Sequence, residues 1–219
     1  MKFTHLFFDL DGTLIDSKSG IFNSLQCTLE EIGIPSSDWP GDFNPFIGPP
    51  LRISFKTLFG FDDDMAEKAT NIYRKYYSSN GIQEFDIFPG IAEALTALHK
   101  SGFSISLVTS KAEVYASAII QETGFSAIFQ TISGCELNGD RSDKAELIMY
   151  TLNKLGINPS PEILMIGDRN HDLIGARTAR ISSAAVLYGY GSLEELTTES
   201  PLLLIHSPGD LVSKITCEN

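Results

Sequence analysis

Continuous apolar runs of strand length recur along the chain, and turn residues bound each of them. These runs lack the alternation of a half-exposed strand, so they are typical of strands that are covered on both faces, as in a parallel sheet. Segments with apolar residues at helical spacing lie between the runs, which favours a doubly wound, mostly parallel α/β sheet. The predicted strands are residues 4–10, 105–109, 163–167, 184–188 and 202–205.

One long interval, residues 16–85, breaks this rhythm with helical patterns and no convincing strand. Apolar side chains from Ile21 to Ile32 keep helical spacing, and two further helical stretches cover 50–58 and 62–77. Helices inserted between the first strand and the next strand–helix unit indicate a separate helical domain. We therefore expect a core of residues 1–15 and 86–219 with a helical cap domain at residues 16–85.

The charge balance narrows the class of partner. The chain has 219 residues with 16 Lys and Arg against 28 Asp and Glu, which gives a formal net charge of -12. This is the wrong sign for binding a nucleic-acid polymer or an anionic membrane surface. A small ligand is therefore expected, with a monomer or a weak homo-oligomer as the default state.

Cysteine usage and hydrophobicity bear on the compartment. Cys27, Cys135 and Cys217 lie far apart with no C-x-x-C spacing, which argues against a disulfide framework or a zinc knuckle. No stretch approaches the roughly 20 apolar residues of a membrane span, and the first apolar run meets two aspartates before it could act as a signal peptide. We expect a cytoplasmic protein.

Two aspartates stand at the carboxyl end of the first predicted strand. In an extended segment, side chains two residues apart point the same way, so Asp9 and Asp11 face one spot at the carboxyl end of a buried strand. Carboxylates this close repel each other, and a cation or a shared proton is needed to hold them there. Gly12 allows a tight turn, and Thr13 offers a hydroxyl and an amide. An aspartate-rich turn with solvated caps is the alternative.

A later strand repeats this arrangement, because Gly167 and Asp168 follow a buried apolar run. A third carboxylate that converges on Asp9 and Asp11 makes an all-oxygen site of the kind that Mg²⁺ prefers. Asp172 is expected to orient its neighbours, and His171 is interpreted as a loop histidine that forms hydrogen bonds.

Two further positions offer groups that bind anions. Thr109 and Ser110 end a strand just before a helix expected to begin at Lys111, where unpaired amides favour a negative ligand. Ser110 is equally well explained as a helix N-cap. Lys144 lies in the first turn of another helix, where a cation opposes the helix dipole, so pairing with carboxylates or phosphate is expected. A solvated surface lysine is the alternative.

Together these four short motifs, in their order along the chain, resemble those of the haloacid dehalogenase superfamily. The helical interval resembles that family's cap, and residues 46–51 and 188–192 are most similar to its phosphoglycolate phosphatase-like branch. The matching positions are Asp9, Asp11, Gly12 and Thr13 in the first motif, Thr109 in the second, Lys144 in the third, and Gly167, Asp168 and Asp172 in the fourth.

The resemblance implies a Mg²⁺-dependent hydrolase that acts on a small phosphorylated metabolite. Asp9 is then the nucleophile that forms an aspartyl-phosphate, and Asp11 is the acid and base. Mg²⁺ is held by Asp9, the backbone carbonyl of Asp11, and Asp168. Thr109 and Lys144 hold the transferring oxygens. The remaining implied substrate contacts are Gly12, Thr13, Ser110 and, from the cap, Arg52, which is equally well read as a surface arginine.

Within the superfamily, the acid at Asp11 favours phosphate esters over haloacids and phosphonates. Ile21 stands where similar sugar-phosphate mutases carry a histidine, which favours hydrolysis over transfer. A 5'-nucleotidase or a pyrophosphatase of the same superfamily is the alternative activity. A catalytically silent module, which binds a ligand or a protein on the same fold, is the alternative of another class.

A different phosphatase chemistry also fits one stretch of sequence. Cys135, Arg141 and Ser142 have the C-x5-R-[ST] spacing of cysteine-dependent phosphatases. Glu136 and Asp140 lie within that loop, where they repel phosphate and disfavour the thiolate that such a loop needs. We therefore assign no phosphatase role to Cys135.

Overall fold

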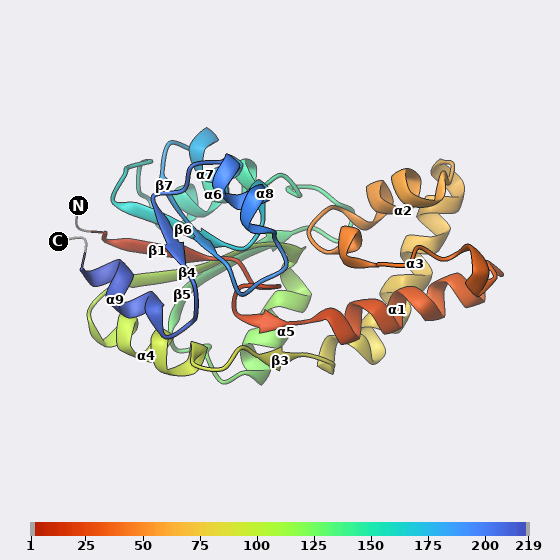
Figure 1. Ribbon diagram of the computed structural model, residues 1–219, viewed down its shortest axis with the longest axis horizontal. Coiled ribbons are helices and arrows are strands. Elements are labelled where there is room, and N and C mark those ends of the chain that lie inside the picture. Colours follow the sequence, from red (N-terminus) through yellow and green to blue (C-terminus); the bar gives the residue numbers. More distant parts are fainter. Residues whose placement is uncertain (1–2, 218–219) are drawn as a thin grey trace. The chain divides into compact units, whose positions relative to one another are not determined.

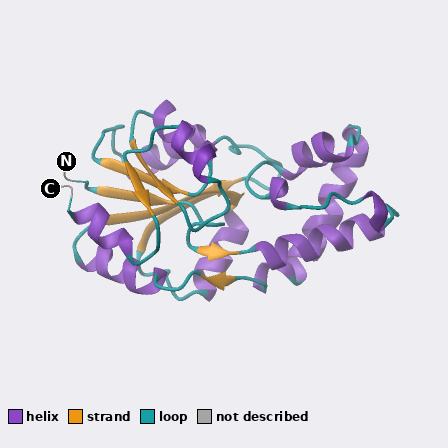
Figure 2. Ribbon diagram, viewed as in Figure 1, coloured by secondary structure: helices purple, strands orange, loops and turns teal. Residues whose placement is uncertain are grey.

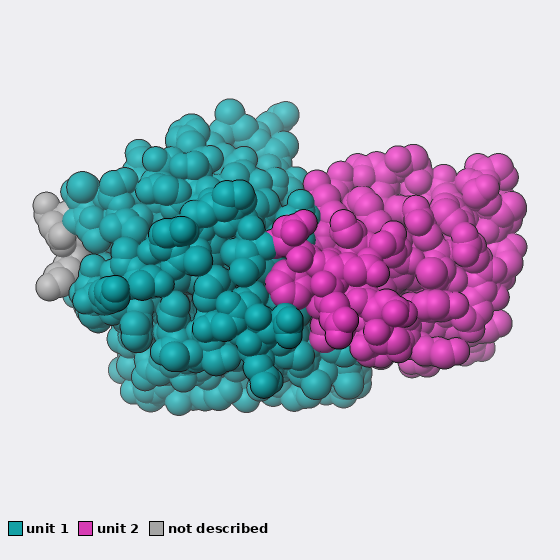
Figure 3. Space-filling model, turned by 90° about the horizontal axis from the view of Figure 1, so that it is seen from below, with its two compact units in different colours: residues 1–16, 87–219 teal, residues 17–86 magenta. Residues whose placement is uncertain are grey.

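The structure is a computed structural model that describes residues 3–217. The chain divides into two compact units, a larger unit of residues 1–16 and 87–219 and a smaller unit of residues 17–86 (Figure 3). Each unit is described by itself. Among the described residues, no helix is long and apolar enough to cross a membrane.

The larger unit is built on a parallel sheet that has six strands within the described residues, in the order β5-β4-β1-β6-β7-β8 (Figure 1). Helices cover both faces of this sheet (Figure 2). The doubly wound α/β fold predicted from the apolar runs is therefore confirmed. The strands are β1 (His5–Phe8), β4 (Ser104–Ala112), β5 (Phe129–Cys135), β6 (Ile163–Gly167), β7 (Ser182–Val186) and β8 (Leu203–Ile205).

The helices of the larger unit follow the strands in alternation. On one face, α6 packs against α7, and their apolar side chains meet those of the central strands, such as Phe7 and Met165, in one buried cluster. Elsewhere in the unit, α4 packs against α9. The helices are α4 (Ile91–Lys100), α5 (Glu113–Glu122), α6 (Lys144–Leu155), α7 (Asn170–Thr178), α8 (Leu193–Thr198) and α9 (Asp210–Thr216).

Strand β4 runs further than the sequence pattern predicts. It continues through Ala112, so α5 begins at Glu113 and the expected helix start at Lys111 is wrong. Pairing with β5, which includes the partners Ala112 and Cys135, keeps this polar end of β4 in the sheet. Ser110 is therefore a strand residue and not a helix N-cap.

The pattern missed β5 and misplaced one loop. Polar residues interrupt the apolar run of β5, so the strand has no clear signal of its own and is defined by its pairing with β4. Helix α7 begins at Asn170, so His171 lies in its first turn and not in a loop.

The smaller unit is helical and contains α1 (Lys18–Glu31), α2 (Leu51–Phe59) and α3 (Asp63–Ser79), with α3 packed against both other helices. Asp62 precedes helix α3 and caps its N-terminus, because its carboxylate accepts a hydrogen bond from the Met65 amide over 2.9 Å. Three short 3-10 turns complete it: Ser36–Asp38, Asn44–Phe46 and Gly81–Gln83.

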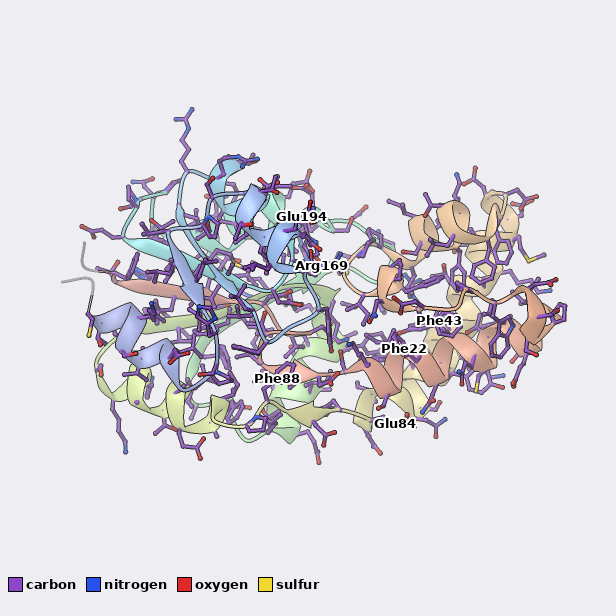
Figure 4. All side chains as sticks on the ribbon, viewed as in Figure 1. Phe22, Phe43, Glu84, Phe88, Arg169 and Glu194 are labelled. Carbon is purple, nitrogen blue, oxygen red and sulfur yellow. The ribbon has the colours of Figure 1, made fainter. Side chains whose placement is uncertain are left out.

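Aromatic side chains form the core of the smaller unit. Phe43 is buried and contacts Phe22 and Phe46 edge to face, with ring centroids 5.7 and 6.2 Å apart. Phe22 and Phe43 are labelled in Figure 4. The Trp39 indole donates a hydrogen bond to the Ile34 carbonyl over 3.0 Å. Phe43 and Trp39 thus both have a packing role in this unit.

A two-stranded ladder of β2 (Ile15–Asp16) and β3 (Asp86–Ile87) lies outside the main sheet. These are the two places where the chain passes from one unit to the other. The smaller unit is therefore an insertion connected to the rest of the chain at two neighbouring points.

Candidate active site

The carboxyl ends of three adjacent strands bring the predicted acidic residues together. Strand β1 lies between β4 and β6, and the amide of Asp9 donates to the Ile166 carbonyl of β6 over 2.9 Å. Asp9 therefore stands beside the end of β6, directly after which Asp168 follows. This edge of an open parallel sheet is where ligands bind in such folds.

Lys144 is the cation at the centre of this edge. Its Nζ lies 3.1 Å from Oδ1 of Asp9 and 2.8 Å from Oδ1 of Asp172, and it donates to the Val108 carbonyl over 3.0 Å. Its side chain is buried. Burial alone lowers the pKa of Lys144, but Asp172 and Asp9 outweigh it and hold the pKa above its usual value. Lys144 is therefore a fixed positive charge.

Helix α6 starts at this lysine and is adapted to it. Asp143 caps the helix by accepting a hydrogen bond from the Glu146 amide over 3.0 Å. A cation in the first turn opposes the helix dipole, and the two carboxylates offset that cost. The side chain of Lys144 also needs a glycine at position 175 of α7, because a Cβ there would lie 2.8 Å from Cγ of Lys144.

The carboxyl groups buried at this edge have shifted pKa values. Burial raises the pKa of Asp9 to about 6, with Lys144 opposing the shift and Asp172 and Asp11 adding to it. The pKa of Asp168 is raised well above its usual value by burial and by the charges of Asp172 and Asp9. Asp172 has a lowered pKa, because Lys144 outweighs its burial. One lysine does not compensate this much negative charge, so the edge favours a further cation.

Asp168 is held in a defined orientation by neighbours that are distant in sequence. Its Oδ1 accepts a hydrogen bond from the Thr13 hydroxyl over 3.2 Å, and its Oδ2 accepts one from the Tyr190 amide over 2.8 Å. The backbone of Gly12 lies so close that a Cβ there would be 2.1 Å from Oδ2. Asp168 thus lies directly against the turn that follows Asp11.

The loop of residues 188–192, which the sequence analysis gave only as part of the family resemblance, belongs to this site. The Tyr188 hydroxyl donates to the Thr13 carbonyl over 3.0 Å. A Cβ at Gly189 would lie 2.3 Å from Cβ of Asp168. The pair of glycines around Tyr190 is the sequence signal that could have indicated so close an approach.

Asp11 has a cationic partner that the sequence analysis did not single out. Lys111 Nζ lies 2.9 Å from Oδ2 of Asp11, and both side chains are largely buried, with exposures of 8% and 15%. The register of β4 against β5 shifts between Val108 and Ala112, so strand alternation does not predict which way Lys111 points. Its position directly after Thr109 and Ser110 is the signal that could have drawn attention to it.

The other predicted contacts fall into two groups. Thr109 is buried at this edge, and its Oγ1 accepts a hydrogen bond from the Lys111 amide over 3.2 Å, while Ser110 beside it is partly buried. Arg52 belongs to the smaller unit, where it is half exposed and pairs with Asp63 at 2.9 Å and Glu67 at 3.9 Å. The structure brings together the predicted residues of the larger unit, namely Asp9, Asp11, Gly12, Thr13, Thr109, Ser110, Lys144, Asp168 and Asp172.

Two sets of side chains could hold a metal ion at this edge. Asp9, His171 and Asp172 have ligand atoms within 4.8 Å of one another. The ammonium group of Lys144 already pairs with both carboxylates of that set, at 3.1 Å from Asp9 and 2.8 Å from Asp172, and so takes the place of a cation between them. Asp9 and Asp168, with the backbone after β1, form the all-oxygen alternative. This second set suits a hard divalent cation better.

The C-x5-R loop does not form an anion site. Arg141 pairs with Glu136, and its guanidinium stacks over the Tyr150 ring at 4.2 Å from the centroid. The positive charge of Arg141 is thus paired with Glu136 and Tyr150. The negative assignment made for Cys135 from the sequence agrees with this arrangement.

Comparisons with known proteins extend the sequence resemblance. Residues 6–186 match the family model described as haloacid dehalogenase-like hydrolase. A 5'-nucleotidase of Pseudomonas aeruginosa is 40% identical over 201 residues, which cover 92% of this chain and 90% of that protein. A phosphoglycolate phosphatase of Aquifex aeolicus is 30% identical over 207 residues, which cover 94% of this chain and 94% of that protein.

Two further matches complete the picture. The crystal structure of a predicted phosphatase from Clostridium acetobutylicum superposes with a TM-score of 0.90 at 35% identity, over 97% of this chain and 98% of that one. The tyrosine-protein kinase PtkA of Mycobacterium tuberculosis is 35% identical over 91% of this chain and 67% of its own length. The relatives thus include proteins named for phosphate hydrolysis and one named for phosphoryl transfer.

Proposed function

The chain belongs to the haloacid dehalogenase-like hydrolase family, as its four motifs predicted, and from this premise we propose that it is a Mg²⁺-dependent phosphomonoester hydrolase. Its substrate is a small phosphorylated metabolite, and the reaction passes through an aspartyl-phosphate. The observation that carries the proposal is Asp9, a buried carboxylate held at 3.1 Å by Lys144 beside the ion-paired carboxylate of Asp11.

Asp9 is the proposed nucleophile. Its Oδ1 is held by Lys144, which leaves Oδ2 to attack phosphorus and to form the acyl phosphate. Attack expels the alkoxide of the ester, and Asp11 supplies the proton that this leaving group needs. Asp11 then takes a proton from the water that hydrolyses the acyl phosphate, and Asp9 is restored.

The other residues of the edge position the phosphate. In this proposal Lys144 and Thr109 contact the transferring oxygens. A fixed ammonium and a buried hydroxyl stabilise the charge that develops in the transition state, because no water has to reorganise around it. Asp172 keeps Lys144 in place through their 2.8 Å ion pair.

The donor set at this edge fits a magnesium ion. Asp9, the backbone carbonyl of Asp11, and Asp168 would hold it. Burial, and after it the neighbouring carboxylates, raises the pKa of Asp9 and of Asp168, so both carboxylates gain from a nearby cation. When bound, Mg²⁺ neutralises this charge and that of the phosphate, so that an anionic nucleophile can approach an anionic substrate.

The smaller unit, residues 17–86, is the proposed cap domain, and its attachment through β2 and β3 supports that role. In this proposal the cap excludes water and selects the leaving group, and Arg52 binds a second anionic group of the substrate. The free cysteines support a reducing, cytoplasmic setting.

A 5'-nucleotidase activity is the second candidate, because the 40% identical Pseudomonas aeruginosa relative carries that name. A comparison of kcat/KM for phosphoglycolate, nucleoside monophosphates, sugar phosphates and pyrophosphate separates it from the phosphoglycolate phosphatase-like activity. The ester with the highest value identifies the substrate class.

Turnover of p-nitrophenyl phosphate with added Mg²⁺ tests the basic proposal. We expect activity that is lost in EDTA and abolished in Asp9→Asn, and a phosphorylated peptide containing Asp9 in acid-quenched wild type. Cys135→Ser is the control and keeps its activity. Activity in Asp9→Asn, or loss of activity only in Cys135→Ser, overturns the assignment.

A further inference from the structure

The ion pair between Lys111 and Asp11, whose side chains are largely buried, has no role in the reaction proposed above. Nζ of Lys111 lies 2.9 Å from Oδ2 of Asp11, and neither side chain is exposed by more than 15%. Lysine is seldom buried without a specific partner. The position of this lysine beside the proposed acid and base therefore calls for a role.

The backbone around Asp11 is fixed, which leaves its side chain as the part that must be oriented. The Gly12 amide donates to the Ile15 carbonyl over 2.8 Å, and Asp11 itself forms a β-bridge with Ile15. Gly12 has a φ of 78°, a left-handed conformation that suits glycine. The turn therefore sets the Asp11 Cα, and rotation about its side-chain bonds decides where the carboxyl oxygens point.

Lys111 approaches that carboxyl group from the neighbouring strand. Strands β4 and β1 pair in parallel up to Phe8 opposite Leu107, so the polar end of β4 extends beyond the end of β1. The extension of β4 through Ala112 keeps Lys111 on sheet backbone rather than in a loop. Lys111 lies in a stretch of shifted register that paired residues bound on both sides, Val108 with Ser133 and Ala112 with Cys135. A side chain on a segment anchored in this way is well suited to hold another group in place.

The chemistry of an ammonium group then decides which oxygen carries the proton. Lysine has three N–H donors and no acceptor, so Oδ2 of Asp11 can only accept from it. Oδ2 can do so whether the carboxyl group is ionised or neutral. In the neutral acid the carbonyl oxygen is the better acceptor, so the contact with Lys111 favours Oδ2 as the carbonyl oxygen and Oδ1 as the oxygen that carries the proton for the leaving group.

We propose that Lys111 is a positioning residue that holds Oδ2 of Asp11 and thereby presents the protonated Oδ1 to the ester oxygen; this rests on the proposed phosphatase function. As the P–O bond breaks, its electron pair stays on the ester oxygen, and that oxygen takes the proton from Oδ1. Asp11 is left as a carboxylate that Lys111 still holds.

Leaving groups of different basicity test this role. A p-nitrophenolate departs without a proton, whereas the alkoxide of benzyl phosphate needs one, so only the second ester depends on the acid. We expect Lys111→Met to lower kcat/KM for benzyl phosphate at least tenfold more than for p-nitrophenyl phosphate. The ratio kcat/KM is the measurement, because it reports the steps up to release of the leaving group and excludes the later hydrolysis.

Matched variants make the result specific. Lys111→Arg keeps a donor-only cation and is expected to restore most of the benzyl phosphate activity. Asp11→Asn should show the same dependence on the leaving group, and adding Lys111→Met to it should cause little further loss. Lys154→Met, at a half-exposed lysine 4.0 Å from Glu113, is the control for the substitution itself.

The outcomes separate the two proposals. Equal losses on both esters in Lys111→Met show that the lysine acts on phosphate binding or on folding, and overturn its role through Asp11. Additive losses in the double variant overturn it as well. Absence of hydrolysis of either ester by the wild-type protein with Mg²⁺ instead overturns the phosphatase function, and this inference falls with it.

Discussion

The amide of Tyr190 donates a hydrogen bond of 2.8 Å to Oδ2 of Asp168, although 22 residues separate them in the chain. The hydroxyl of the same tyrosine donates to Asp16 over 3.0 Å. One residue of the loop after β7 thus contacts both the proposed metal ligand and the last residue before the smaller unit. The loop of residues 188–192 is therefore part of the site's support.

Replacing Gly189 should damage this support. In Gly189→Ala the added Cβ would lie 2.3 Å from Cβ of Asp168 and 2.4 Å from the Gly12 carbonyl, so one of them must move. We expect the affinity for Mg²⁺ to fall by about 10- to 100-fold, as for other losses of groups that orient metal ligands. The activity of the variant as a function of Mg²⁺ concentration measures this. Gly41→Ala, with nothing within 4 Å of the added Cβ, is the control and should match wild type.

Removing the cation at Lys144 should affect both stability and turnover. In Lys144→Met, Asp9 and Asp172 are left buried without their partner, so we expect no detectable turnover and a loss of about 3–5 kcal/mol in the free energy of unfolding. Urea denaturation measures the second quantity. Adding Asp172→Asn should recover part of the stability but no activity, and a double variant less stable than Lys144→Met would contradict the pairing.

The raised pKa of Asp9 predicts a pH-dependent effect on stability without metal. The pKa of the Asp9 carboxyl group is raised by burial from its ordinary value of 3.8 to about 6, so between these pH values the folded state binds more protons than the unfolded state. Stability therefore falls as the pH rises from about 4 to about 6, and the penalty persists above that range.

Asp9→Asn removes this penalty. In EDTA at pH 7.5, we expect the variant to be more stable than wild type by on the order of 1–3 kcal/mol, with the gain disappearing towards pH 4. Thermal unfolding across this pH range is the measurement. If the variant is less stable than wild type at every pH, the charge of Asp9 does not destabilise the folded state.

The proposed role of Arg52 makes a prediction about substrate choice. If Arg52 binds a second anion, Arg52→Ala should raise KM about tenfold for phosphoglycolate and leave p-nitrophenyl phosphate nearly unchanged. Arg177→Ala, at an exposed arginine paired with Glu199, is the control. If phosphoglycolate and p-nitrophenyl phosphate respond alike, Arg52 serves only its ion pairs with Asp63 and Glu67.

Local patterns in the sequence were enough to determine much of this protein. Buried parallel strands are uniformly apolar, which is why residues 163–167 were predicted with the bounds that the structure has. The same reasoning placed Asp9 and Asp11 at a strand end and Lys144 at a helix start. These features depend on residues within one element, where spacing and side-chain direction are coupled.

Tertiary structure alone decided the contacts that complete the site. The order β4-β1-β6 brings Lys111 to Asp11, and the loop after β7 brings Tyr190 to Asp168. Strand β5 likewise exists through its pairing with β4 and not through its own polar sequence. Such contacts join residues that are far apart in the chain, and the periodicity of a single segment carries no information about which strand becomes its neighbour.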